Sequence, residues 1–306
     1  EQDMRLSSIS PTDLKNEYDI YNQTFLKPVS FATQVKVAQD FFTDYFVSGK
    51  ISKGESATYK VAVKVNETEN GKVFMESELE GNDLFSLIDQ LTVQLNDKLY
   101  LPDAQSNKIQ VIDLPVKELI TSNNDALKNF IKAKILFSQN PQIGQPAIQL
   151  LEKSIEQDPN CTDCHFDLAL LQFLSNNQEA AITAIEKARL LAESQPERKK
   201  MAIRALQLNL NQEIPKMVQL FENWRKLYPN DLNPYTSLMQ FYRMLQQYDK
   251  AKAVGLAAIE NGHRGRFMTQ LANVYTHTEE YDKAEKLLNE FAQLYPHKAN
   301  KTYELA

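Results

Sequence analysis

The stretch Tyr248-Asp249-Lys250-Ala251 returns 33 residues later as Tyr281-Asp282-Lys283-Ala284. Each copy opens a helical pattern just after another such pattern has ended, so its alanine lies where two helices meet. Further helix starts align with these two, and the successive spacings are 34, 36, 34 and 33 residues. A near-constant period of this length predicts stacked helix pairs that share one core. The aligned residues, small except for one methionine, are Ala147, Ala181, Met217, Ala251 and Ala284.

Other features recur in phase with that period. Small or flexible residues follow leucines in the first helices, and prolines close second helices, where a missing N–H does least damage. This pattern resembles the tetratricopeptide repeat (TPR) over residues 123–306, as about five repeats and the start of a sixth helix pair. The resemblance implies an all-α superhelix whose first helices line a groove for a protein or peptide. The recurring residues are Leu168-Ala169, Leu238-Met239, Leu271-Ala272, Tyr242, Tyr275, Pro159, Pro229 and Pro296.

The first third of the chain carries strand patterns instead. Between Ala57 and Asn66 every second residue is apolar, which places Tyr59, Val61, Val63 and Val65 on one buried face of a strand. The stretches Tyr45–Ser52 and Lys72–Leu79 have a similar pattern. Asn70-Gly71 is typical of a hairpin with a two-residue type I′ turn. These features predict a three-strand antiparallel meander.

Helices are expected on either side of this meander. Ser10-Pro11-Thr12-Asp13 is a typical helix start, and Phe31–Phe42 and Asp83–Leu99 are two further helix candidates. The predicted fold class is therefore an α+β domain over residues 1–100, followed by an all-α TPR superhelix over 123–306. Residues 101–122 are predicted to be a connector with one short strand at Ile109–Ile112.

The α+β segment resembles the TolB N-terminal-like domain. The resemblance rests on residues 44–51, on Gly71-Lys72-Val73-Phe74 and on the helix entry at residues 81–87. The first strand and helix of that family have no counterpart here, so we expect the domain to be truncated at its front. A TolB-N-like domain joined to repeats resembles the extracytoplasmic region of CadC-like regulators, receptor kinases or cyclases, as do Arg198-Lys199-Lys200 and residues 220–231.

The CadC-like resemblance implies a bacterial, periplasmic region that senses or scaffolds for signal transduction. The output would be a transcriptional regulator, a kinase or a cyclase, and an N-terminal segment missing from this sequence would provide the membrane anchor. The apparent start of another first helix at Lys298–Ala306 also suggests a longer parent protein. The alternatives are a cytoplasmic location and a freestanding TPR scaffold without signalling output.

Composition and motifs argue against several functional classes. The net charge of −6 gives no general attraction for nucleic acid, and no run of apolar residues is long enough for a membrane segment. None of the four histidines is paired locally with a nucleophile. The sequence also lacks a Gly-rich phosphate loop, a G-x-S-x-G elbow and an H-E-x-x-H zinc motif. We therefore predict a non-catalytic protein with no cofactor, metal or catalytic residue.

Cys161-Thr162-Asp163-Cys164-His165 matches the C-x-x-C-H pattern of haem c attachment. The match falls where one repeat passes into the next, so the same residues suit ordinary packing positions. Zinc would have at most three ligands here. A disulfide between Cys161 and Cys164 is feasible, because residues three apart in a helical turn have Cα atoms about 5 Å apart. Two reduced thiols remain the default, and a haem c redox protein is a remote alternative.

The repeat phase also identifies the residues that would line the groove. One end is apolar, and we expect the chain's own N-terminal domain to occupy it. The other end is polar and suits the backbone of an extended peptide, although Arg243 alone does not make the basic clamp that binds chaperone tails. The candidate binding residues are Phe166, Leu170, Phe173, Leu206, Asn209, Gln240, Arg243, Asn273, Thr276 and His277.

Overall fold

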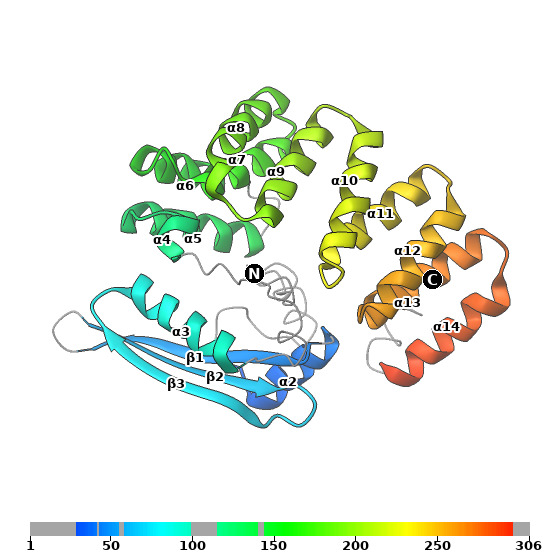
Figure 1. The fold of residues 1–306 in the computed structure, drawn as a ribbon, viewed down its shortest axis with the longest axis horizontal. Coiled ribbons are helices and arrows are strands. Elements are labelled where there is room, and N and C mark those ends of the chain that lie inside the picture. The colour runs from blue at the N-terminus through cyan, green and yellow to red at the C-terminus, as the bar shows by residue number, and fades with distance from the viewer. Residues whose placement is uncertain (1–28, 42, 55–57, 99–114, 140–143, 296–306) are drawn as a thin grey trace.

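The structure, a computed structural model, describes residues 29–41, 43–54, 58–98, 115–139 and 144–295. It consists of a three-stranded antiparallel sheet with helices beside it, followed by an array of antiparallel helices (Figure 1). This is the predicted fold class, which is confirmed. The predicted helix after Ser10, the strand at Ile109–Ile112 and the start of a helix at Lys298 lie outside the described residues. Within the described residues no helix is both long and apolar enough to cross a membrane.

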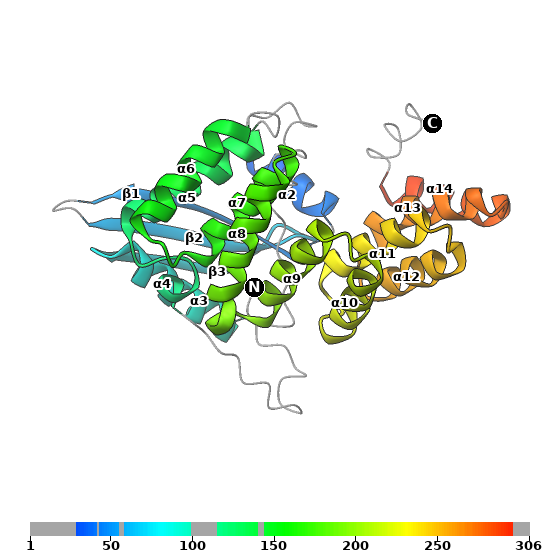
Figure 2. The ribbon, with the colours of Figure 1, turned by 90° about the horizontal axis from the view of Figure 1, so that it is seen from above.

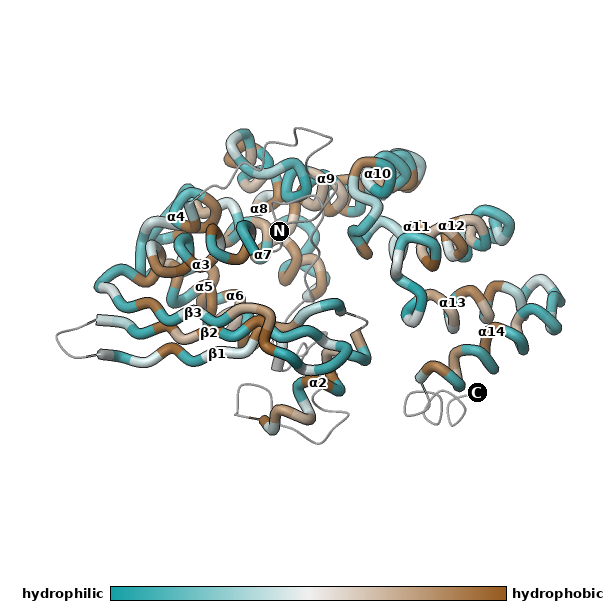
Figure 3. The backbone as a smooth tube through the Cα atoms, turned by 60° about the horizontal axis from the view of Figure 1, so that its bottom comes forward, coloured by the Kyte–Doolittle hydropathy of each residue, from teal (hydrophilic) through white to brown (hydrophobic). Residues whose placement is uncertain are grey.

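The sheet has the strand order β1-β2-β3, with β1 at Tyr45–Lys53, β2 at Tyr59–Glu67 and β3 at Val73–Gly81. Hydropathy alternates along the strands (Figure 3). On β2 the alternation matches burial, since Val61 and Val65 are only 3% and 2% exposed whereas Lys60 and Lys64 are exposed. The register is regular except for an irregularity between Val65 and Asn66, where β2 pairs with β3.

The hairpin between β2 and β3 is confirmed, but the predicted turn type is wrong. Only Gly71 has a positive φ, of 70°, whereas a type I′ turn requires a positive φ at Asn70 as well. The Gly71 N–H donates to the Glu67 carbonyl oxygen at 2.9 Å, so the loop closes as a wider helical-type turn. The Asn70 side chain stabilises this loop by accepting a hydrogen bond from the Lys72 N–H at 2.7 Å.

Two helices pack against the sheet. Helix α2 (Phe31–Asp40) begins at Ser30, whose hydroxyl caps the Thr33 N–H, and its Phe31 ring lies 5.8 Å from the Phe46 ring. Helix α3 (Leu84–Lys98) lies beside β3, where the Ser77 hydroxyl donates to Gln94 Oε1 at 2.6 Å. Both helices lie within about two residues of their predicted bounds, and Leu87 on α3 is buried.

A four-residue helix, α4 (Val116–Leu119), connects the sheet to the helical array. Its Val116 N–H donates to Asp89 on α3 at 2.9 Å, and the Lys117 ammonium contacts Asp83 at 2.7 Å. On the other side, the Glu118 carbonyl accepts a hydrogen bond from Gln195 at 3.5 Å. No sequence pattern indicated this helix, because four residues are too few for a hydrophobic period to be visible.

The helical array runs from α5 to α14, and consecutive helices pack against each other (Figure 2). Helices α5–α9 lie on the side of the sheet that carries α3, while α10–α14 extend away from it (Figures 1 and 2). The bounds are α5 Asn124–Gln139, α6 Gly144–Gln157, α7 Thr162–Leu174, α8 Gln178–Leu191, α9 Glu197–Leu210, α10 Ile214–Leu227, α11 Leu232–Met244, α12 Tyr248–Glu260, α13 Arg264–His277 and α14 Tyr281–Leu294.

The turn inside the four helix pairs from α7–α8 to α13–α14 repeats in conformation as well as in position. Among the described residues, four other than glycine have a positive φ of 55–60°, and each lies five residues before a residue on which the repeats were aligned. Such a left-handed residue ends one helix and lets the next return antiparallel to it. The repeat is therefore present in the backbone, although the side chains at this position differ. These residues are Asn176, Gln212, Gln246 and Glu279.

Candidate partner-binding groove

The polar half of the candidate groove lies on α11 and α13, the first helices of two successive pairs. Gln240 and Arg243 on α11, like Asn273, Thr276 and His277 on α13, are exposed. Residues three or four apart share one face of a helix, so each helix presents its set together. The signature residues of the same helices, such as Leu238 and Ala272, are almost completely buried.

The side chains of Gln240, Arg243 and Asn273 form no hydrogen bond or ion pair with another described residue. Each can therefore bond to an added molecule without losing an internal partner. His277 differs, because its Nδ1–H donates to the Asn273 carbonyl oxygen at 2.8 Å, which leaves Nε2 as the open ring atom. The ring also packs beside Tyr248, with 6.0 Å between centroids.

The apolar half has a different character. Leu206 on α9 is buried, and the partly buried Phe166, Leu170 and Phe173 of α7 pack against its cluster, which draws on α7, α8 and α9. Asn209 is half-buried on α9. The structure therefore brings these apolar residues together as a core between two repeats. That the N-terminal domain covers them stays a prediction.

Two ion pairs join first helices in this half, and the sequence analysis missed both. Lys134 on α5 contacts Asp167 on α7 at 2.8 Å, and Lys199 on α9 contacts Asp163 on α7. The ammonium of Lys199 also lies 5.2 Å from the centre of the Phe166 ring. Burial raises the pKa of the Asp163 carboxyl, and the nearby Lys199 charge opposes that shift. The only available signal was that Asp163 and Asp167 share a helix face with Phe166.

The two halves of the groove differ in how their polar side chains are paired. In the first half, carboxylates and ammonium groups from neighbouring helices neutralise each other. In the second half, the exposed candidate side chains on α11 and α13 are two amides, one hydroxyl, one guanidinium and one imidazole. Met244, 59% exposed, adds an apolar surface at the end of α11. The second half thus offers unoccupied hydrogen-bonding groups with an apolar contact beside them.

The cysteine motif is part of the packing between repeats. Cys161 and Cys164 are joined by a disulfide with a Cα–Cα distance of 5.3 Å, one of the alternatives that the sequence left open. Both residues are fully buried, and Cys164 Sγ lies 3.1 Å from the Ser154 hydroxyl on α6. The imidazole of His165 is bonded through Nε2 to the Pro159 carbonyl oxygen at 3.0 Å. This arrangement leaves no thiol for a thioether link and directs the histidine towards the backbone.

Reduction of this disulfide is expected to lower the free energy of unfolding by about 2 kcal/mol, because the unfolded chain loses the constraint of a four-residue loop. The measurement is chemical denaturation with and without dithiothreitol. A Cys161→Ala/Cys164→Ala variant provides the control, since its stability should not respond to the reductant. Equal stability of the wild-type protein under both conditions would contradict this prediction.

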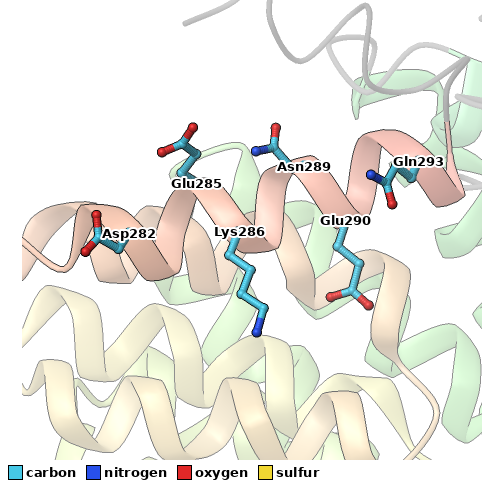
Figure 4. A pocket seen from close by; sticks show the side chains of 6 residues that line it. All are labelled: Asp282, Glu285, Lys286, Asn289, Glu290 and Gln293. Atoms are coloured by element: carbon cyan, nitrogen blue, oxygen red, sulfur yellow. The ribbon is translucent and has the colours of Figure 1, made fainter.

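The concavity on α14 is not a candidate site. It is lined by Asp282, Glu285, Lys286, Asn289, Glu290 and Gln293, which all belong to this one helix (Figure 4). A surface formed by a single helix cannot enclose a ligand. Its exposed polar residues therefore serve as controls for the groove.

No model of a known protein family matches the chain, and no curated protein matches it. Several solved structures resemble its helical part. They include TTC0263, a thermophilic TPR protein of Thermus thermophilus, at 13% identity and a TM-score of 0.41, over 58% of this chain and 97% of that one. MamA of Desulfovibrio magneticus has 13% identity and a TM-score of 0.42, over 56% and 95%. YrrB, a TPR protein with an unusual peptide-binding site, has 17% identity and a TM-score of 0.39, over 60% and 93%. The likeness is one of fold.

Proposed function

We propose that the helical array is a non-catalytic binding module that holds an extended segment of another protein against α11 and α13. The observation that carries this proposal is the set of exposed side chains without internal partners, namely Gln240, Arg243 and Asn273. A surface that only meets water has no need to collect such groups on successive first helices. The same helices bury their opposite faces in the core and hold the set in place.

The chemistry of these groups suits a peptide backbone. A side-chain amide both donates and accepts, so it can bond to the C=O and N–H of one residue of an extended chain. Adjacent packed helices lie about 8–10 Å apart, and an extended chain advances about 3.3 Å per residue. Gln240 and Asn273, which lie on two different first helices, would therefore meet backbone groups of different residues of the extended chain. Arg243 would bind a carboxylate, and Met244 an apolar side chain.

The test begins with selection of binders from a random heptapeptide display library on the whole chain. Replacement of both Arg243 and Asn273 by alanine is expected to weaken the selected peptides about tenfold or more, because two hydrogen-bonding groups are lost. Fluorescence anisotropy measures the Kd. A Glu285→Ala/Asn289→Ala variant on α14 is the matched control and should bind as the wild type does. Unchanged affinity in the groove variant would remove this surface from the proposal.

The cellular role that we propose is extracytoplasmic sensing or scaffolding within a larger membrane signalling protein. The TolB-N-like and CadC-like resemblances support this role, and the Cys161–Cys164 disulfide is consistent with an oxidising compartment. We further propose domains at residues 1–100 and 123–306, joined by a connector at 101–122.

Alkaline phosphatase fused after Leu294 in the native reading frame tests the location. An active fusion supports export, whereas an inactive but stable fusion favours a cytoplasmic scaffold.

A further inference from the structure

The outer edge of β1 combines an open strand with uncovered apolar side chains. In the described residues β1 pairs with β2 alone and is an outer strand of the sheet (Figure 3). Every second residue of β1 therefore directs its backbone N–H and C=O away from the sheet. Val47 and Ile51 are 61% and 59% exposed, although their direct partners on β2, Val65 and Val61, are among the most buried residues. The apolar face of the sheet thus continues beyond the strands that are covered.

The position of α3 explains this difference within one face. Its contacts lie on β3, where Gln94 bonds to Ser77 and the Leu87 side chain lies beside Gly81. Directly paired residues of an antiparallel sheet share a face, so Val47 and Ile51 point to the same side as α3 but lie two strands away from β3. They form an apolar surface at a strand edge that would accept a further strand.

The charges at the two edges of the sheet are opposite. On the other face, Lys60 and Lys64 of β2 pair with Glu80 and Glu76 of β3 at 3.3 and 2.8 Å. Lys50 of β1 shares that face and forms no ion pair with another described residue. Lys50 therefore has no carboxylate beside it among the described residues, and a carboxylate on an added strand would lie at that position. A second copy of β1 would bring another Lys50, not a carboxylate, to this face of the sheet, which argues against a second copy.

We infer that β1 is a strand-addition site for an extended, acidic segment of another protein. The added strand places aliphatic side chains on Val47 and Ile51, and its backbone pairs with the open edge of β1. On the opposite face, a carboxylate pairs with Lys50. This surface is separate from α11 and α13, so its role does not depend on the proposed function of the groove.

A fluorescent peptide that copies residues 73–80, Val-Phe-Met-Glu-Ser-Glu-Leu-Glu, is a suitable probe because its three glutamates occupy alternate positions and the apolar Met75 and Leu79 lie on the other face. We expect it to bind the whole chain and to protect amides of β1, rather than β3, from hydrogen exchange. A Val47→Thr/Ile51→Thr variant should weaken binding about tenfold, since two exposed cross-strand contacts are lost while β-branching is kept. Two further peptides carry N-methyl groups at the odd or at the even positions. The one whose methyl groups replace the N–H groups that would pair with β1 should not bind.

The controls distinguish binding at β1 from binding at the opposite edge strand, in the groove or between two copies of the chain. Val73→Thr, at an exposed valine on the opposite edge strand, and Arg243→Ala/Asn273→Ala, in the groove, should both leave the Kd of the peptide unchanged. A peptide with lysines in place of the three glutamates should bind more weakly than the acidic one. Equal binding by the Val47→Thr/Ile51→Thr variant, or by both N-methylated peptides, would overturn the inference. A dimer in light scattering that Ile51→Thr dissociates would overturn it as well, because the occupant would then be a second copy.

Discussion

Replacing Trp224 by alanine is expected to lower the free energy of unfolding by about 3–5 kcal/mol. Trp224 is buried on α10, where its ring stacks on Phe221 with 5.8 Å between centroids. Its Nε1–H donates to Asp231 Oδ2 at 2.9 Å, and Asp231 in turn caps the start of α11. The substitution therefore leaves a large cavity at the junction of two repeats and removes a hydrogen bond from the capping carboxylate.

Urea denaturation followed by far-UV circular dichroism measures this loss, since the variant lacks the only tryptophan of the chain. Leu227→Ala is the matched control, because Leu227 lies on the same helix but is half-exposed, so its removal should change stability by only about 0.5 kcal/mol. If Trp224→Ala cost less than about 1.5 kcal/mol, the cluster around it could not be the main link between α10 and α11.

The parts of the fold that could be predicted are those in which one pattern repeats many times. The spacing from Ala147 to Ala284 predicted the helix pairs, because each alanine lies where two helices approach closely and nothing larger fits without displacement. Met217 meets the same requirement with a flexible side chain and is also buried. Alternation around Val61 and Val65 likewise predicted the buried face of the central strand.

Features set by single local interactions could not be predicted in this way. The left-handed turn residues range from Asn176 to Glu279, so no residue type marks them, and the three-dimensional return of the chain imposes their conformation. The β2–β3 turn follows the backbone hydrogen bonds of Glu67 with Lys72 and Gly71 rather than the Asn-Gly preference. Helix α4 exists because Asp89 and Asp83 bond to it across the domain junction, which a local pattern cannot reveal.

The candidate groove was only partly accessible to sequence reasoning. Repeat phase selected the residues that lie on the outer face of α11 and α13, and those are exposed in the structure. Phase could not reveal that Leu206 is buried in a core with α7, or that Lys199 and Asp163 form an ion pair, because both depend on how neighbouring repeats are rotated. Whether any of these residues contacts a partner stays a prediction.

Lys199→Met is expected to cost about 2–3 kcal/mol at pH 7, because it leaves the buried Asp163 carboxylate without its ammonium partner. Methionine keeps most of the apolar stem of lysine and removes only the ammonium, which also lies over the Phe166 ring, so the loss reflects charge rather than packing. Lys200→Met is the matched control. Lys200 pairs with Glu197 at the exposed surface, and its removal should change stability by less than about 0.5 kcal/mol.

The loss should also depend on pH in a defined direction. Burial holds the pKa of Asp163 above its ordinary value of 3.8, with Asp167 adding to the shift and Lys199 and Lys134 opposing it. Above that raised pKa the Asp163 carboxylate is charged in both states, but it is poorly solvated only in the folded protein, which lowers the free energy of unfolding. Lys199→Met increases this cost. As the pH falls towards about 4, Asp163 is protonated in the folded state and the cost disappears. The stability difference between variant and wild type should therefore shrink on acidification, and Lys199→Met/Asp163→Asn should show no such change. A difference that stays constant between pH 7 and pH 4 would mean that Lys199 acts through packing alone.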